Sequence, residues 1–170
     1  MKEFVIKNKN KILIFVLLFL VVVVFLFKIF SDDNKKSKIS IVTSSSKFYT
    51  VSSCISRYIN YLYSEDVDNI ILLLDNSYRK KNNIDASNLF DNIEKFDSFY
   101  SFQARKMYEE KINDSITKYY VYGYLLKEEL DNYNYSEKKD YYIIIYLNST
   151  KDLYSVAPYD GDIFINGGDR

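Results

Sequence analysis

Residues 116–128 read ITKYYVYGYLLKE, and their side chains alternate between two sets over the whole length. A period of two is that of an extended strand, whose successive side chains point to opposite faces of a sheet. Tyrosine and valine, which fill several of these positions, are favoured in strands. One set is Tyr120, Tyr122, Tyr124 and Leu126, and the other is Tyr119, Val121, Gly123 and Leu125. The segment therefore predicts a central strand with apolar or aromatic side chains on both faces.

Three more segments share this period, and together with the first they predict four antiparallel strands. The other strands are expected over residues 99–109, 141–148 and 153–157. The polar stretch 131–140 is expected to be a hairpin connection. A short strand at 38–43 and a short edge segment at 163–165 are further possibilities.

The residues before these strands follow the helical period instead. Apolar side chains at three- and four-residue spacings predict a helix over 47–63. Ser64 is suited to cap a second helix over 65–75, with one further turn through Lys81. A third, shorter helix is expected over 86–95. Helices followed by strands indicate an α+β domain, with three helices on one face of a curved four-stranded sheet and a tyrosine-rich, partly solvated opposite face.

The N-terminal part contains 16 consecutive apolar residues, Ile12 to Phe27, followed by Lys28. A span of the bilayer takes about 20 helical residues, with about 17 as a lower limit, and a lysine near the end can reach the headgroups. A cleaved signal peptide is the alternative, but no small-residue cleavage site follows the run. The predicted organisation is a basic segment (1–11), a transmembrane helix (12–30), a polar tether (31–46), an α+β domain (47–166) and a flexible tail (167–170).

The charged residues around this run predict an orientation. Residues 1–30 carry five lysines against one glutamate, whereas Asp32 and Asp33 follow the run closely. By the positive-inside rule the N-terminus is expected in the cytoplasm and the domain outside the cell membrane. The abundance of Asn, Lys, Ile and Tyr is interpreted as the coding bias of an AT-rich, low-GC Gram-positive bacterium.

Several function classes are disfavoured by composition. Histidine is absent and Cys54 is the single cysteine, so neither an internal disulfide nor a Cys/His zinc site can form. The residues after the anchor have a small acidic excess, which disfavours a nucleic-acid partner. Asp160-Gly161-Asp162 is interpreted as a turn because the remaining ligands of a calcium loop are missing. No metal or cofactor is expected, and Cys54 is interpreted as a small core residue.

The helix at 47–63, the segment SEDVDNIILLLDNSYRKKN and the strands ITKYYVYGYLLKEE and YYIIIYLNSTKDLYSVAPYD carry a family resemblance. In order and pattern they resemble the nuclear transport factor 2-like (cystatin-like cone) fold, over about residues 47–160. The resemblance implies helices packed into the concave side of a bent antiparallel sheet. It also implies a similarity to membrane-anchored extracytoplasmic proteins that have this fold. Some of those proteins are components of conjugation or secretion machinery.

This fold supports several functions, so function has to be argued from the site. Tyr120, Tyr122, Tyr142 and Tyr146 are the candidate pocket or interface residues, because tyrosine combines apolar area with a hydroxyl group. The expected function is a non-catalytic interaction or assembly module with an unknown protein partner. A small-ligand or peptide binder using the cone is the alternative. An isomerase-like enzyme is a third possibility, with Asp75 or Asp91 as the carboxylate.

Overall fold

The computed structural model describes residues 18–23, 39–128 and 135–165. The chain divides into two compact units, Met1–Ser37 and Lys38–Arg170. In the first unit residues 18–23 are helical. Within the described ranges no helix is both long and apolar enough to cross a membrane. The transmembrane helix predicted over 12–30 is therefore not found, and only 18–23 of that range is described.

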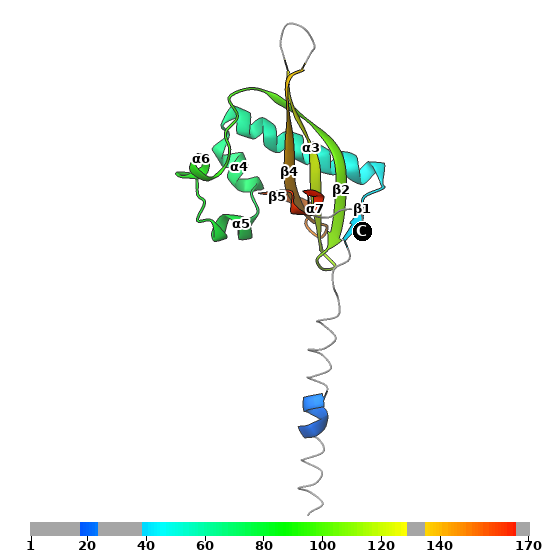
Figure 1. Ribbon diagram of the computed structural model, residues 1–170. Helices are drawn as coiled ribbons and strands as arrows, with labels where there is room; N and C mark the ends of the chain where they lie inside the picture. The colour runs from blue at the N-terminus through cyan, green and yellow to red at the C-terminus, as the bar shows by residue number, and fades with distance from the viewer. Residues whose placement is uncertain (1–17, 24–38, 129–134, 166–170) are drawn as a thin grey trace, which may run out of the picture. The chain divides into compact units, whose positions relative to one another are not determined.

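The second unit is an α+β domain built on one antiparallel sheet (Figure 1). Among the residues described, the sheet has five strands in the order of the chain, so the prediction of four strands is wrong. The strands are β1 (Ile39–Ile41), β2 (Tyr100–Lys111), β3 (Ile116–Glu128), β4 (Tyr135–Asn148) and β5 (Leu153–Pro158). The additional strand is β1, which pairs with Tyr108–Glu110 of β2 although it lies in the predicted tether. Residues 31–38 and 166–170 lie outside the described residues.

The central strand β3 has the bounds that its alternation predicts. It pairs with β2 on one side and β4 on the other along most of its length. The register with β2 shifts between Ala104 and Lys106, which is a β-bulge. Gly123 lies opposite this bulge, and a Cβ there would be 2.5 Å from the carbonyl oxygen of Gln103. The close approach of the two backbones thus requires glycine.

The helices of this unit are more numerous than predicted. They are α3 (Ser45–Ser64), α4 (Val67–Leu73), α5 (Asn76–Lys81), α6 (Leu89–Asn92) and α7 (Asp162–Ile165). Side chains of Ser44, Asp66 and Asp75 accept backbone N–H groups at the starts of α3, α4 and α5. The Asp75 cap separates α4 from α5, so the predicted second helix and the further turn are two helices.

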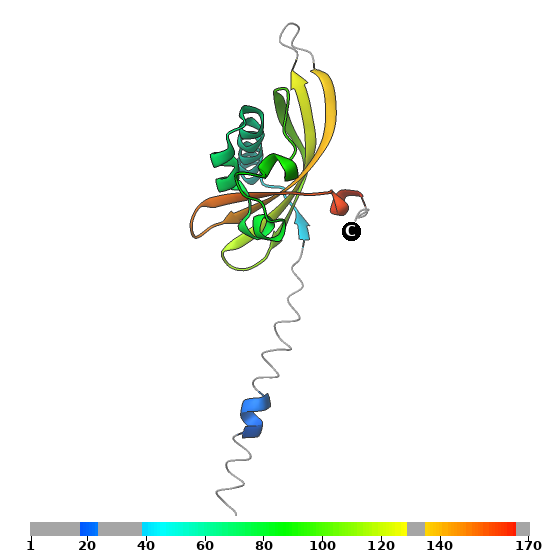
Figure 2. The same ribbon diagram turned by 90° about the vertical axis from the view of Figure 1, so that its left-hand side faces the viewer.

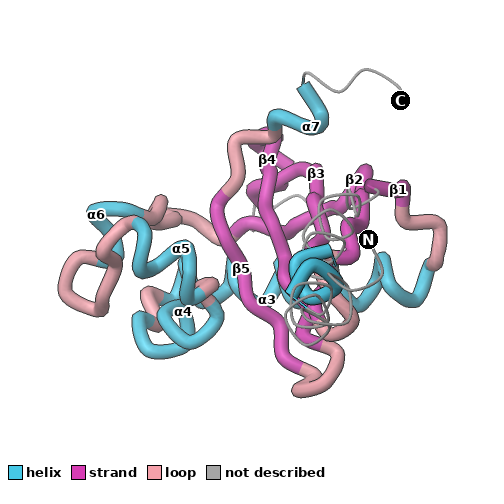
Figure 3. Tube along the Cα trace, turned by 90° about the horizontal axis from the view of Figure 1, so that it is seen from below, coloured by secondary structure: helices cyan, strands magenta, loops and turns pink. Residues whose placement is uncertain are grey.

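The apolar core lies between α3 and one face of the sheet. Val51, Ile55 and Ile59 of α3 are almost fully buried against this face, whose residues include Val121 and Ile145. No polar or charged residue is buried in the described part of the chain. Figure 2 shows α3 and the α4–α6 group on one side of the sheet and α7 on the other. Seen from below, α4–α6 lie beyond the β5 edge (Figure 3).

Three element boundaries differ from the sequence prediction for local reasons. Helix α6 is one turn long instead of spanning 86–95, and Ile93 after it is extended. Strand β4 starts at Tyr135 because the polar residues 137–140 pair with β3 instead of forming a loop. Residues 162–165 form a helix and not an edge strand, after Gly161 reverses the chain with φ of 85°. A left-handed φ of this kind favours glycine.

Candidate functional site

The sheet face that points away from α3 carries a row of tyrosines, which we call the outer face. Register places Tyr108, Tyr120 and Ile144 side by side on β2, β3 and β4. Tyr122 and Tyr142 form the next cross-strand pair, and their rings stack with centroids 5.1 Å apart. Because strand side chains alternate, every second residue of β3 and β4 belongs to this face.

Two of these tyrosines donate their hydroxyl groups to carboxylates. Tyr120 bonds to Glu110 Oε2 at 2.6 Å, and Tyr122 bonds to Asp140 Oδ1 at 3.0 Å. Burial of Tyr120, followed by its hydrogen bond to Glu110, raises the pKa of its hydroxyl well above the ordinary value. These bonds hold the phenol groups in place and leave the ring faces for other contacts.

Basic side chains lie over the rings on the same face. Lys118 Nζ is 4.4 Å from the centroid of Tyr120, and Lys138 Nζ is 3.6 Å from that of Tyr124. Arg105 contacts the Tyr124 ring as well. Cation–π contacts of this kind stabilise by about 0.5–1 kcal/mol at exposed sites. The outer face thus combines aromatic area with positive charge, although the chain as a whole is neutral.

The C-terminal helix α7 covers the middle of the outer face. The ring of Phe164 lies within 6 Å, centroid to centroid, of the rings of Tyr108, Tyr122 and Tyr142, at 5.4, 5.8 and 5.9 Å. Tyr159 accepts the backbone N–H of Ile163 and packs against Tyr120. The middle of the face is therefore covered by the chain itself.

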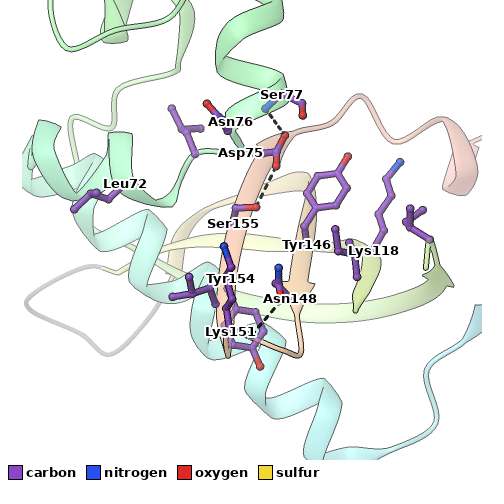
Figure 4. Close-up of a pocket in the computed structure, with 14 residues that line it drawn as sticks. Leu72, Asp75, Asn76, Ser77, Lys118, Tyr146, Asn148, Lys151, Tyr154 and Ser155 are labelled. Atoms are coloured by element: carbon purple, nitrogen blue, oxygen red, sulfur yellow. Dashed lines mark hydrogen bonds between the residues drawn. The ribbon is translucent and has the colours of Figure 1, made fainter. Parts of the chain in front are cut away.

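One end of the outer face forms a pocket of about 630 Å³ (Figure 4). Its floor consists of two cross-strand rows from β3, β4 and β5. These rows are Lys118–Tyr146–Ser155 and Ile116–Asn148–Leu153. The volume lies within the roughly 300–1,000 Å³ that is typical of ligand pockets.

The segment between α4 and α5 forms one wall of this pocket. Leu74 makes a parallel bridge to Val156 of β5, and the Asp75 N–H donates to the Val156 carbonyl at 2.8 Å. The Asp75 carboxylate accepts the backbone N–H groups of Ser77 and Tyr78 and the Ser155 hydroxyl. Asp75 is thus fixed as a helix cap at the pocket wall.

Burial is the main cause that raises the pKa of the Tyr146 hydroxyl in this pocket. The negative charges of Asp75 and Glu110 raise it further. Figure 4 shows the Tyr146 and Lys118 side chains next to each other on neighbouring strands, extending in the same direction. The phenol is therefore a neutral hydrogen-bonding group at neutral pH.

The four tyrosines singled out by sequence all lie on the outer face, but in different surroundings. Tyr146 lines the pocket, Tyr122 and Tyr142 lie under α7, and Tyr120 is 8 % exposed between them. None of them belongs to the core between α3 and the sheet.

The other residues considered for chemistry are dispersed. Asp91 is exposed on α6, whereas Asp75 lies near Tyr146 in the pocket. Cys54 is half-buried on α3, and burial raises the pKa of its thiol, which keeps it protonated at neutral pH. Asp160 accepts the N–H of Asp162 in the turn before α7. Among the described residues no three acidic or cysteine side chains are placed to hold a metal ion.

Sequence reasoning missed the polar partners of Tyr146. Lys118, Ser155 and Asn148 come from three strands, and their proximity depends on a register that alternation alone does not specify. The sequence did contain one indication of Lys118. This lysine belongs to the same alternating set of strand positions as Tyr120 and Tyr122, and therefore to the same face of the sheet. The wall from Leu72 to Ser77 gave no signal, since its contact with β5 is long-range.

No family model, curated protein or solved structure matches this chain. The resemblance to the nuclear transport factor 2-like fold therefore stays a prediction from element order.

Proposed function

We propose that the α+β domain is a non-catalytic interaction module that binds a partner protein through the outer face of its sheet. The observation that carries this proposal is the division of the sheet into two unlike faces. One face is closed by α3 with apolar side chains, and the other carries tyrosines, basic side chains and a pocket. Aromatic residues and arginine are enriched in protein interfaces, which supports the assignment.

The arrangement also argues against general-base chemistry at Asp75. A catalytic base needs a carboxylate within reach of a substrate proton. The Asp75 carboxylate already accepts three hydrogen bonds, from two backbone N–H groups and from Ser155. Its role is structural, and a binding role for the pocket fits the lining better than a catalytic one.

The location proposed for this module is the outer surface of the cell membrane. Its support is the sequence of residues 1–33, with lysines before the apolar run and Asp32 and Asp33 after it. In an intact-cell experiment on an Asp32→Cys, Cys54→Ala variant, a membrane-impermeant maleimide should label Cys at position 32. Shielding of that position until the cells are lysed would overturn the location.

A photo-crosslinking scan of the full-length chain tests the binding face. A benzophenone amino acid replaces Leu153 or Ile112 beside the pocket, which are 59 % and 47 % exposed. Matched controls carry it at Tyr49 or Tyr63 of α3, which are 76 % and 44 % exposed. In cells that make the protein, one partner should be captured from both pocket positions and not from α3. Capture from α3 alone, or from no position, would contradict the proposal.

A further inference from the structure

Two lysines, Lys118 and Lys151, are among the residues that line the pocket. Lys118 projects from the floor, and Lys151 lies in the turn before β5. Neither forms an ion pair with a residue that the structure describes. The described carboxylate in the lining is Asp75, whose charge is held by three hydrogen bonds. The lining therefore carries one net positive charge, which suits an acidic group. Glu110, which lies opposite Lys118 in the strand register, is outside the lining and accepts the Tyr120 hydroxyl.

The rim of the same pocket is aliphatic and exposed. Leu72 is 77 % exposed, Leu153 is 59 % exposed and Ile112 is 47 % exposed. These residues come from α4, from the edge strand β5 and from the turn after β2. A single exposed leucine is ordinary, but three around one hollow form a patch that another surface can cover.

We propose that this pocket binds a segment of the partner protein that carries an acidic side chain next to aliphatic ones. The carboxylate lies between Lys118 and Lys151, with the side-chain amide of Asn148 available as a donor. The aliphatic side chains cover Leu72, Leu153 and Ile112. The inference deepens the proposed function, because it assumes a protein partner on the outer face and assigns the chemistry of its contact.

A protein segment fits better than a small anion because of the rim. A small carboxylate inside the pocket would satisfy the lysines but leave the three aliphatic side chains in water. A segment that continues across the rim removes them from water as well, which contributes about 25 cal/mol for each Å² of apolar area covered. The exposed rim and the two lysines together thus favour a protein segment over a small anion.

The test uses a displayed library of random eight-residue peptides panned on the purified full-length chain. Enriched peptides should combine Asp or Glu with Leu, Ile or Val, and synthetic copies should bind in fluorescence anisotropy. The double variant Lys118→Gln, Lys151→Gln should weaken that binding by about tenfold or more, which is the loss expected for two partly desolvated ion pairs. It should also lose most of the salt dependence of the wild-type affinity.

A double variant with the same charge change serves as the control. Lys95→Gln with Lys139→Gln removes two lysines whose partners are Glu65 and Glu94, away from the pocket lining. Its peptide affinity should equal that of wild type. A Leu153→Asn variant should lose affinity yet keep the salt dependence, which separates the apolar contact from the charged one. Unchanged circular dichroism confirms that each variant is folded.

The outcomes separate this inference from the proposed function. Equal binding by wild type and the Lys118/Lys151 variant would overturn the inference, as would enrichment of basic or charge-free peptides. If nothing is enriched while crosslinks still form at Leu153, the inference falls and the interaction module stands. Self-association that the Lys118/Lys151 substitutions abolish would assign the pocket to a second copy of the chain and overturn the inference. If no crosslinks form at Leu153 or Ile112, the proposed function itself fails.

Discussion

At the scale of single residues, Tyr58 and Tyr120 contrast two ways of burying a phenol. Tyr58 is 1 % exposed in the core, and its hydroxyl has no hydrogen-bond partner among the described residues. Tyr120 is 8 % exposed on the outer face and donates to Glu110. An unsatisfied buried polar group costs free energy, whereas a bond to a carboxylate contributes to stability.

The same substitution should therefore have opposite effects at these two positions. Tyr58→Phe should raise the free energy of unfolding by about 1 kcal/mol, because it removes a buried hydroxyl that lacks a partner. Tyr120→Phe should lower it by about 1–2 kcal/mol, because it removes a hydrogen bond to a charged group. Urea unfolding followed by circular dichroism measures both. Equal losses at the two positions would contradict the hydrogen-bond assignment.

At the scale of elements, Gly123 tests the junction of β2 and β3. A Cβ there would also be 2.6 Å from two ring carbons of Phe102, besides the clash with Gln103. Gly123→Ala should lower the free energy of unfolding by about 2–3 kcal/mol, because the strands must separate at the bulge. Thr117→Ala in the same strand is the control and should stay within about 1 kcal/mol of wild type. A Gly123→Ala protein as stable as wild type would show that the strands can move apart easily.

Strong periodicity predicted the elements, and their ends depended on contacts that are distant in sequence. The alternation over 116–128 gave β3 its bounds, and the stripe over 47–63 gave α3 within two residues at its start. The polar residues at the start of β4 looked like a loop, but pairing with β3 makes them strand. Strand β1 is three residues long, and its partner lies about 70 residues further on. Helix α7 depends on the contacts of Phe164 with Tyr108, Tyr122 and Tyr142.

At the scale of the whole molecule, buried tyrosines should make the domain sensitive to alkali. Burial is the first cause that raises the pKa of the hydroxyls of Tyr58, Tyr119, Tyr120, Tyr141 and Tyr146. A raised folded-state pKa means that the neutral form is favoured by folding. The associated stability is complete below the unfolded-state pKa near 10 and is lost as the pH rises above it.

The free energy of unfolding should accordingly be nearly constant between about pH 7 and 9 and fall steeply above about pH 10. Urea titrations at several pH values measure this fall, and absorbance at 295 nm reports tyrosinate. In the folded protein most tyrosinate should appear together with unfolding. Titration of all the tyrosines near pH 10 without loss of structure would show that they are open to water.

The site was less predictable than the fold for a physical reason. The alternation of side chains along β3 and β4 placed the four candidate tyrosines on one face. It could not predict which of them other parts of the chain would cover. Helix α7 covers Tyr122 and Tyr142, because Phe164 packs against their rings. The wall from Leu72 to Ser77 forms the pocket near Tyr146. Both are contacts between distant parts of the chain.

The assignment of the outer face as the binding face is tested most directly by one ratio. The ratio is the amount of partner crosslinked from a benzophenone at Leu153 to the amount crosslinked from one at Tyr49, in cells that produce each full-length variant at the same level. Both side chains are exposed, so a higher crosslinking yield at Leu153 cannot result from greater solvent exposure of that position. The interaction module proposed here predicts a large excess at Leu153, with one partner band that the Lys118→Gln, Lys151→Gln substitutions weaken. Equal yields, or an excess at Tyr49, would contradict it.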